Sequence, residues 1–257
     1  MADEGYVPPG LHDLYPPPLF DAIPWLIKSI VLVAISVVII LAFFLAATRR
    51  PALVPSRLQF TGELVYSFVR NSMGRDVIGS KDYKRFVPLL FTLFTFILVN
   101  NLYGILPFVS FPPMAKIAFP MVLAIISLVV FNYVGIKRQG FVPYFRNMMF
   151  IPGVPVFIYP LLAPIELLST LVIRPLSLTL RLFANMFSGH LLLLVFITGS
   201  QYLMLEVANP LLKVAGAATG VMAVVLTFYE LFVEVFQAYI FTLLTALYIT
   251  SAISEDH

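Results

Sequence analysis

Cysteine is absent from the 257-residue chain, and charged residues make up only 11% of it. The first absence excludes disulfides, thiolate metal sites and cysteine nucleophiles. The three histidines are too scattered to predict a metal centre, and no cofactor is expected. The scarcity of charge excludes an ordinary soluble domain, in which charged residues average about 25%.

Hydrophobic residues dominate instead, at 60% of the chain, and the mean hydropathy is +0.97. Long runs of Leu, Ile, Val and Phe favour helices, whereas a membrane barrel would show alternating segments of about ten residues. The sequence therefore predicts an all-α integral membrane protein. The net charge of +3 comes from basic residues clustered in loops, and no Walker-type or G-x-G-x-x-G motif is present. Neither nucleic acid nor nucleotide is an expected ligand of this chain.

The hydrophobic runs predict five membrane-crossing helices and one interfacial amphipathic helix. The stretch 24–47 is long enough to cross a core of about 30 Å, and it follows an extended, proline-rich tail over 1–23. That tail has no basic region before an apolar core, so we do not expect a cleavable signal peptide. Residues 56–79 alternate apolar and charged positions at helical spacing, which is typical of an interfacial helix. Residues 86–136 predict a two-helix membrane hairpin.

The part over 161–252 contains two apolar segments, each about twice as long as a membrane crossing needs. Each is either two short helices or one steeply tilted helix. Because the polar positions continue through Pro175 without a break, we expect a pair of long tilted helices. Lysine and arginine cluster at 49–85 and 137–146, which predicts that these loops lie on the cytoplasmic side. The N-terminus, 108–117 and 200–210 are then outside, and five crossings place the C-terminus inside.

A polar stripe follows the first long segment. Its members recur every three or four residues, the period of one helix face: Glu166, Thr170, Arg174, Ser177, Arg181, Asn185 and Ser188. Arg181 lies among leucines and cannot lose its proton, and a cation in hydrocarbon costs at least ~3 kcal/mol. Arg181 is therefore a functional candidate. The alternative is that it reaches a helix end or forms a structural ion pair with Glu166 or Glu230.

A second stripe, on the last segment, consists of Glu230, Glu234 and Gln237 at steps of four and three. Burial and like charge disfavour joint ionisation of two carboxylates one turn apart, so one of them could exchange protons as a relay requires. The alternative is that one carboxylate only neutralises Arg181 or Arg174. His190 is either a hydrogen-bonded structural group or a relay member, and we expect it to form one coupled unit with Glu230.

Two motifs give the chain a family resemblance: R-L-F-A-N-M-F-S-G-H-L-L from Arg181, and E-x-x-x-x-x-x-Q-A-Y-I-F-T-L-L from Glu230. Over nearly its full length the chain resembles subunit a of the F-type (rotary) ATP synthase. The resemblance implies that Arg181 is the essential arginine facing the c-ring. It also implies an outer half-channel and an inner half-channel, lined respectively by Asn185, His190, Glu230, Glu234 and Gln237, and by Glu166 with Ser169.

The chain departs from the family pattern at two places. Asn100 and Asn101 stand where some members have acidic residues, and Glu234 occupies a position that is usually apolar. These departures leave the lining of the outer half-channel open.

By the same resemblance, the expected function is that of the stator subunit coupling proton flow to ring rotation and ATP synthesis, without catalysis by this chain alone. Expected partners are the c-ring, peripheral-stalk subunit b and membrane lipid. A bacterial plasma membrane is favoured over a mitochondrial inner membrane. The alternatives are a secondary ion-coupled transporter, which predicts inverted repeats, and a non-conducting structural membrane subunit that would tolerate replacement of Arg181.

Overall fold

The computed structural model describes residues 8–10, 28–49, 52, 54–106, 112–149 and 156–253. Helices account for nearly all of this part, and no strand occurs among the residues described. Five helices are long and apolar enough to cross a membrane, the last two with 47 and 44 residues. The predicted fold class, an all-α integral membrane protein with five crossings, is thus confirmed. Of the predicted tail, only residues 8–10 fall within the described ranges.

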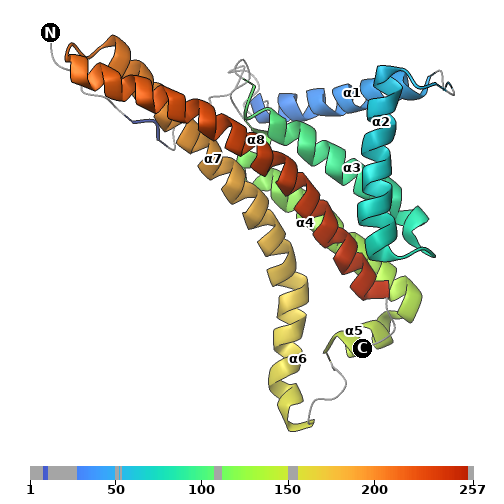
Figure 1. The fold of residues 1–257 in the computed structure, drawn as a ribbon. Helices are drawn as coiled ribbons and strands as arrows, with labels where there is room; N and C mark the ends of the chain where they lie inside the picture. The colour runs from blue at the N-terminus through green and yellow to red at the C-terminus, as the bar shows by residue number, and fades with distance from the viewer. Residues whose placement is uncertain are drawn as a thin grey trace, which may run out of the picture.

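The first helix, α1 (Lys28–Thr48), packs mainly against the third helix and leaves most of its apolar side chains exposed. Helix α2 (Arg57–Phe68) runs across the ends of α1 and α3, as Figure 1 shows. The hydroxyl of Ser56 accepts a hydrogen bond from the backbone N–H of Gln59 and so caps α2. A π-helical segment, η2 (Val69–Ile78), continues α2 toward the hairpin.

The hairpin consists of α3 (Tyr83–Leu102) and α4 (Ala118–Gln139), with the short helix η3 (Pro113–Ala115) between them. Arg138 at the end of α4 donates a 2.9 Å hydrogen bond to the Asp82 carboxylate just before α3. Gly140, at φ +87°, then turns the chain directly into α5 (Phe141–Met149). The ion pair therefore joins the start of α3 to the end of α4 at the open end of the hairpin.

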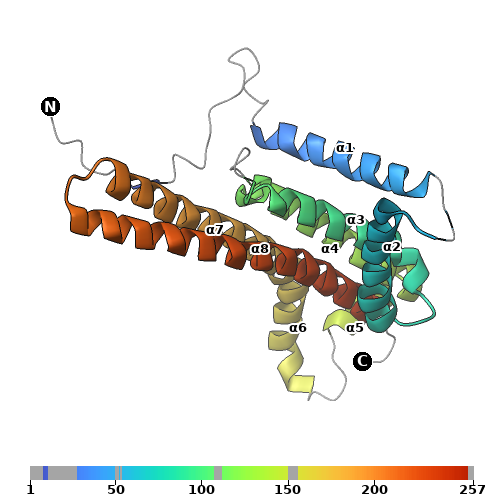
Figure 2. The same cartoon turned by 45° about the horizontal axis from the view of Figure 1, so that its top comes forward.

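The fourth crossing combines α6 (Tyr159–Leu168), the π-helical segment η5 (Ser169–Ile173) and α7 (Arg174–Leu205), and the short helix η4 (Val156–Ile158) precedes it. Figure 2 shows α6 turning away from the line of α7 at this junction. Such bends are typical of π-helical segments. The sequence predicted the long helix but not its bend, because the polar period continues through the junction.

The last helix, α8 (Pro210–Ile253), lies beside α7 along most of its length, and both views agree on this (Figures 1 and 2). At 1.5 Å per residue α8 is about 66 Å long, more than twice a hydrocarbon core. The main core lies where α7 and α8 meet the hairpin and η2. Its fully buried members include Met73, Leu90, Ile97, Leu182 and Ala246. These contacts fix the positions of the polar stripes.

Candidate functional site

Arg181 lies on the exposed face of α7, while its neighbours Leu178 and Leu182 are buried against the bundle. Within the described part of the chain no carboxylate forms an ion pair with it. The predicted alternative, a structural pair with Glu166 or Glu230, is therefore not present. Arg181 is thus an exposed residue on a helix apolar enough to cross a membrane.

Glu166 pairs with a different arginine. One carboxylate oxygen of Glu166 lies 3.7 Å from the guanidinium of Arg174, and that guanidinium stands 5.3 Å from the centre of the Tyr248 ring. Both side chains are about three-tenths exposed. Ser169, also half-buried, begins the π-helical segment η5 between them. At the inner part of the predicted site, Glu166 and Arg174 thus form a local ion pair across the bend at η5. In the sequence this pair lies far from the carboxylates of α8.

The seven positions of the first stripe do not all share one environment. Thr170 is buried, Glu166, Arg174 and Asn185 are half-buried, and Ser177, Arg181 and Ser188 are exposed. The five positions from Arg174 to Ser188 all lie on α7, so their different exposure reflects what packs against each turn of this helix.

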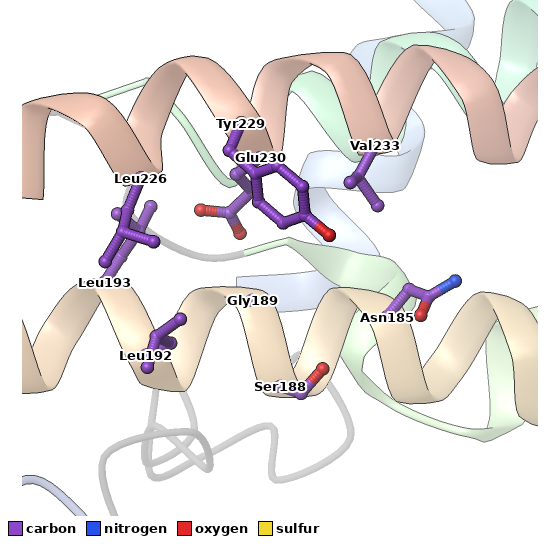
Figure 3. Close-up of a pocket in the computed structure, with 9 residues that line it drawn as sticks. All are labelled: Asn185, Ser188, Gly189, Leu192, Leu193, Leu226, Tyr229, Glu230 and Val233. Carbon is purple, nitrogen blue, oxygen red and sulfur yellow. The ribbon is translucent and has the colours of Figure 1, made fainter.

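A cavity of about 260 Å³ opens between α7 and α8. Figure 3 shows Asn185 and Ser188 on α7 facing Tyr229, Glu230 and Val233 on α8. Glu230 is only 4% exposed, and neither of its carboxylate oxygens has a hydrogen-bond partner among the described residues. A buried carboxylate in this state is stable only when protonated or hydrated. The cavity therefore holds a group suited to exchanging protons.

Gly189 makes room for this carboxylate. A Cβ atom at residue 189 would lie 2.9 Å from Oε1 of Glu230, closer than side chains approach one another. His190, the next residue, is 4% exposed. The structure places Glu230 against the α7 turn that bears His190, and direct coupling of the two side chains stays a prediction.

The rest of the second stripe is buried as well. Glu234 is fully buried and Gln237 is 8% exposed. Glu234 meets the end of α3: the Asn101 amide donates a 3.2 Å hydrogen bond to its backbone carbonyl. A Cβ atom at Gly104 would lie 2.8 Å from its Oε1. Sequence reasoning gave no role to Gly104 or Gly189, because a close approach between helices leaves no periodic signal.

Two long apolar helices carry one buried carboxylate between them, a second against the hairpin, and an arginine on their exposed face. These features define a class: multi-pass helical membrane proteins with an interior suited to proton transport. Comparison with known proteins narrows the class. The family model described as ATP synthase A chain matches residues 30–250. The chain belongs to this family, subunit a of the ATP synthase.

The relatives agree over most of the chain. The ATP synthase subunit a of Nocardioides sp. is 42% identical over 265 residues, which cover 99% of this chain and 95% of that protein. The subunit a of Rhodococcus erythropolis is 38% identical over 258 residues, which cover 100% of this chain and 94% of that protein. That of Parafrankia sp. is 47% identical over 208 residues, covering 80% and 69%. The chain is a multi-pass protein of the bacterial plasma membrane, in the membrane sector of the synthase, and serves proton transport and ATP synthesis.

Proposed function

We propose that this chain is the stationary, non-catalytic subunit that leads protons to and from a rotating c-ring, with Arg181 facing the ring carboxylates. The position of Arg181 carries the proposal. It is exposed on a membrane-crossing helix and has no ion pair in the described part of the chain. A cation there costs at least ~3 kcal/mol unless an anion or water compensates it. A carboxylate on a partner that slides past α7 supplies that anion.

The function follows from the charge. A ring carboxylate can face lipid only when it is protonated, and it can ionise only where a neighbouring cation or water stabilises its charge. Arg181 provides the cation and, since it never deprotonates, blocks direct proton passage between the two half-channels. Each proton that crosses contributes ~2.3 kcal/mol per 100 mV, which biases rotation in one direction.

The remaining site residues divide between the two half-channels. Asn185, His190, Glu230, Glu234 and Gln237 line the outer one, and Glu166 with Ser169 the inner one. The burial of Glu230 and Glu234 between α7, α8 and the hairpin supports the outer assignment. We further propose that peripheral-stalk subunit b and lipid cover other faces, and that no nucleotide or nucleic acid binds this chain.

The exposed position of Arg181 also weighs against the secondary transporter, in which a substrate-binding arginine would line an enclosed cavity near the membrane midplane. The cavity between α7 and α8 is lined by Glu230 and Asn185, and Arg181 does not belong to its lining.

Replacement of Arg181 by lysine in the assembled synthase tests the proposal. Lysine is a point charge that can deprotonate when desolvated, so we expect loss of coupled ATP-driven pumping. Arg138→Lys, which can keep the ion pair with Asp82, is the matched control and should pump normally. Near-normal pumping by Arg181→Lys would show that the guanidinium is not essential. That result would favour the alternative of a non-conducting structural membrane subunit.

A further inference from the structure

Glu234, the carboxylate among the departures from the family pattern, lies fully buried in the core between helices. Its side chain is 0% exposed, and neither carboxylate oxygen has a hydrogen-bond partner among the described residues. A carboxylate in such a place is neutral or in contact with water, because an isolated buried charge is too costly. No arginine or lysine forms an ion pair with it in the part of the chain that the structure describes. Glu234 is thus available to accept and release a proton.

The carboxylate of Glu234 points toward the loop end of the hairpin. Gly104, two residues beyond the last residue of α3, approaches it so closely that a Cβ atom would lie 2.8 Å from Oε1. The same Cβ would lie 3.5 Å from Pro112, which precedes η3. The absence of a side chain at Gly104 therefore lets the Glu234 carboxylate pack against the chain at the loop end of the hairpin, which we assign to the outer side.

Asn101 fixes this arrangement from α3. It is 0% exposed, its amide donates to the Glu234 backbone carbonyl, and its own Oδ1 has no hydrogen-bond partner in the described residues. The amide oxygen on α3 and the carboxylate on α8 are thus both buried polar groups without a protein partner, the kind of group that buried water satisfies.

Glu230 lies one turn earlier on α8 and belongs to the cavity on the α7 side. Residues four apart on a helix are neighbours, so the two carboxylates lie close together on α8 although each faces a different part of the protein. One contacts the end of α3, and the other lines the space beside Asn185.

We infer that protons enter the outer half-channel between α3 and α8, with Glu234 as the first relay group and with Asn101 and Gly104 as positioning residues. The inference rests on the proposed function. Neutral Glu234 passes its proton to ionised Glu230, directly or through one water, and a proton from outer water then binds the ionised Glu234 carboxylate. Glu234 thus ends neutral as it began, and Glu230 gains one proton and becomes neutral.

The adjacent asparagines supply a matched pair of variants for the assembled synthase in vesicles. Asn100 is also 0% exposed and also donates a side-chain hydrogen bond, but to Ser36 of α1 at 2.9 Å. Asn101→Leu and Gly104→Ala should slow proton-driven ATP synthesis roughly tenfold, below the 10²–10⁴ that positioned proton-transfer groups contribute in enzymes. Asn100→Leu should leave synthesis near its normal rate at equal assembly. Equal losses at both asparagines would overturn the route.

Two further readouts separate a relay from a structural role. Asn101→Ser supplies a small polar hydroxyl in place of the amide and leaves room for water, so it should recover much of the transport that Asn101→Leu loses. In the cysteine-free chain, Asn101→Cys should react with an impermeant thiol reagent from the outer side, whereas Asn100→Cys should not. No recovery, or reaction of Asn100→Cys alone, contradicts the inference.

Glu234 itself gives the decisive comparison. Glu234→Gln should slow transport at least as much as Asn101→Leu. Glu234→Asp, which keeps an acid, should transport faster than Glu234→Ala even where the glutamine variant fails to assemble. Normal transport in Glu234→Gln, with Arg181→Lys inactive, would overturn this route and leave the proposed function standing. Normal transport in Arg181→Lys would instead overturn the proposed function.

Discussion

The carboxylate of Glu230 occupies the place that a side chain at residue 189 would need: its Oε1 lies 2.9 Å from a Cβ atom built on Gly189. The contact joins α7 and α8 at the wall of the cavity that Asn185 also lines. The acid can reach α7 here only because residue 189 has no side chain.

Gly189→Ala should therefore displace Glu230 and slow proton transport. Overpacking of this kind costs about 1–3 kcal/mol, which the assembled protein can tolerate while the relay geometry is lost. Gly220→Ala is the control, since its Cβ would lie 2.8 Å from the Ser200 hydroxyl, with no carboxylate involved. Pumping and assembly are measured for both, and equal pumping defects would show that helix spacing alone is responsible.

His190 and Glu230 should behave as one coupled unit. Each single replacement by an uncharged residue should slow transport, and the exchange His190→Glu with Glu230→His should recover part of it, because it keeps one imidazole and one carboxyl group across the two helices. A double-mutant cycle on proton flux measures the coupling. Additivity within about 0.5 kcal/mol, as expected of independent sites, would contradict the relay pair.

The inner ion pair can be separated from a role in the proton path. Arg174→Gln removes the partner of Glu166, and the partly exposed pair should contribute no more than about 1 kcal/mol. Glu166→Gln should slow proton flux far more than Arg174→Gln does, because it removes a titratable group. Equal losses in both single variants, with no further loss in the double variant, would indicate that Glu166 serves only the ion pair.

Chain topology can be tested with single cysteines. The Arg138–Asp82 ion pair requires residues 80–82 and the end of α4 to share one side of the membrane. Ser80→Cys should therefore react with an impermeant thiol reagent from the inner side, and Ile117→Cys and Ala208→Cys from the outer side. All three positions are exposed in the structure. Reaction of residues 80 and 117 from the same side would refute the predicted topology.

Hydrophobic length and composition were enough to predict five crossings, because a membrane core imposes a fixed number of apolar residues. The polar periodicity likewise predicted that Glu230, Glu234 and Gln237 share one buried face of α8. The alternative pairing of Arg181 with Glu166 is not found, because Glu166 lies 3.7 Å from Arg174 across η5. Contacts between distant segments, such as Asn101 with Glu234, have no periodic signal at all.

The segment η5 also has a mechanical consequence for the rest of the crossing. Each residue in an α-helix advances the chain by about 100° around its axis. Loss of a single residue from Ser169–Ile173 would turn α6, with Glu166, by about that angle relative to α7, while the contacts of α7 with α8 could stay in register. A one-residue deletion in η5 would therefore change the direction of Glu166 relative to Arg181, while Arg181 and the contacts between α7 and α8 stay in place.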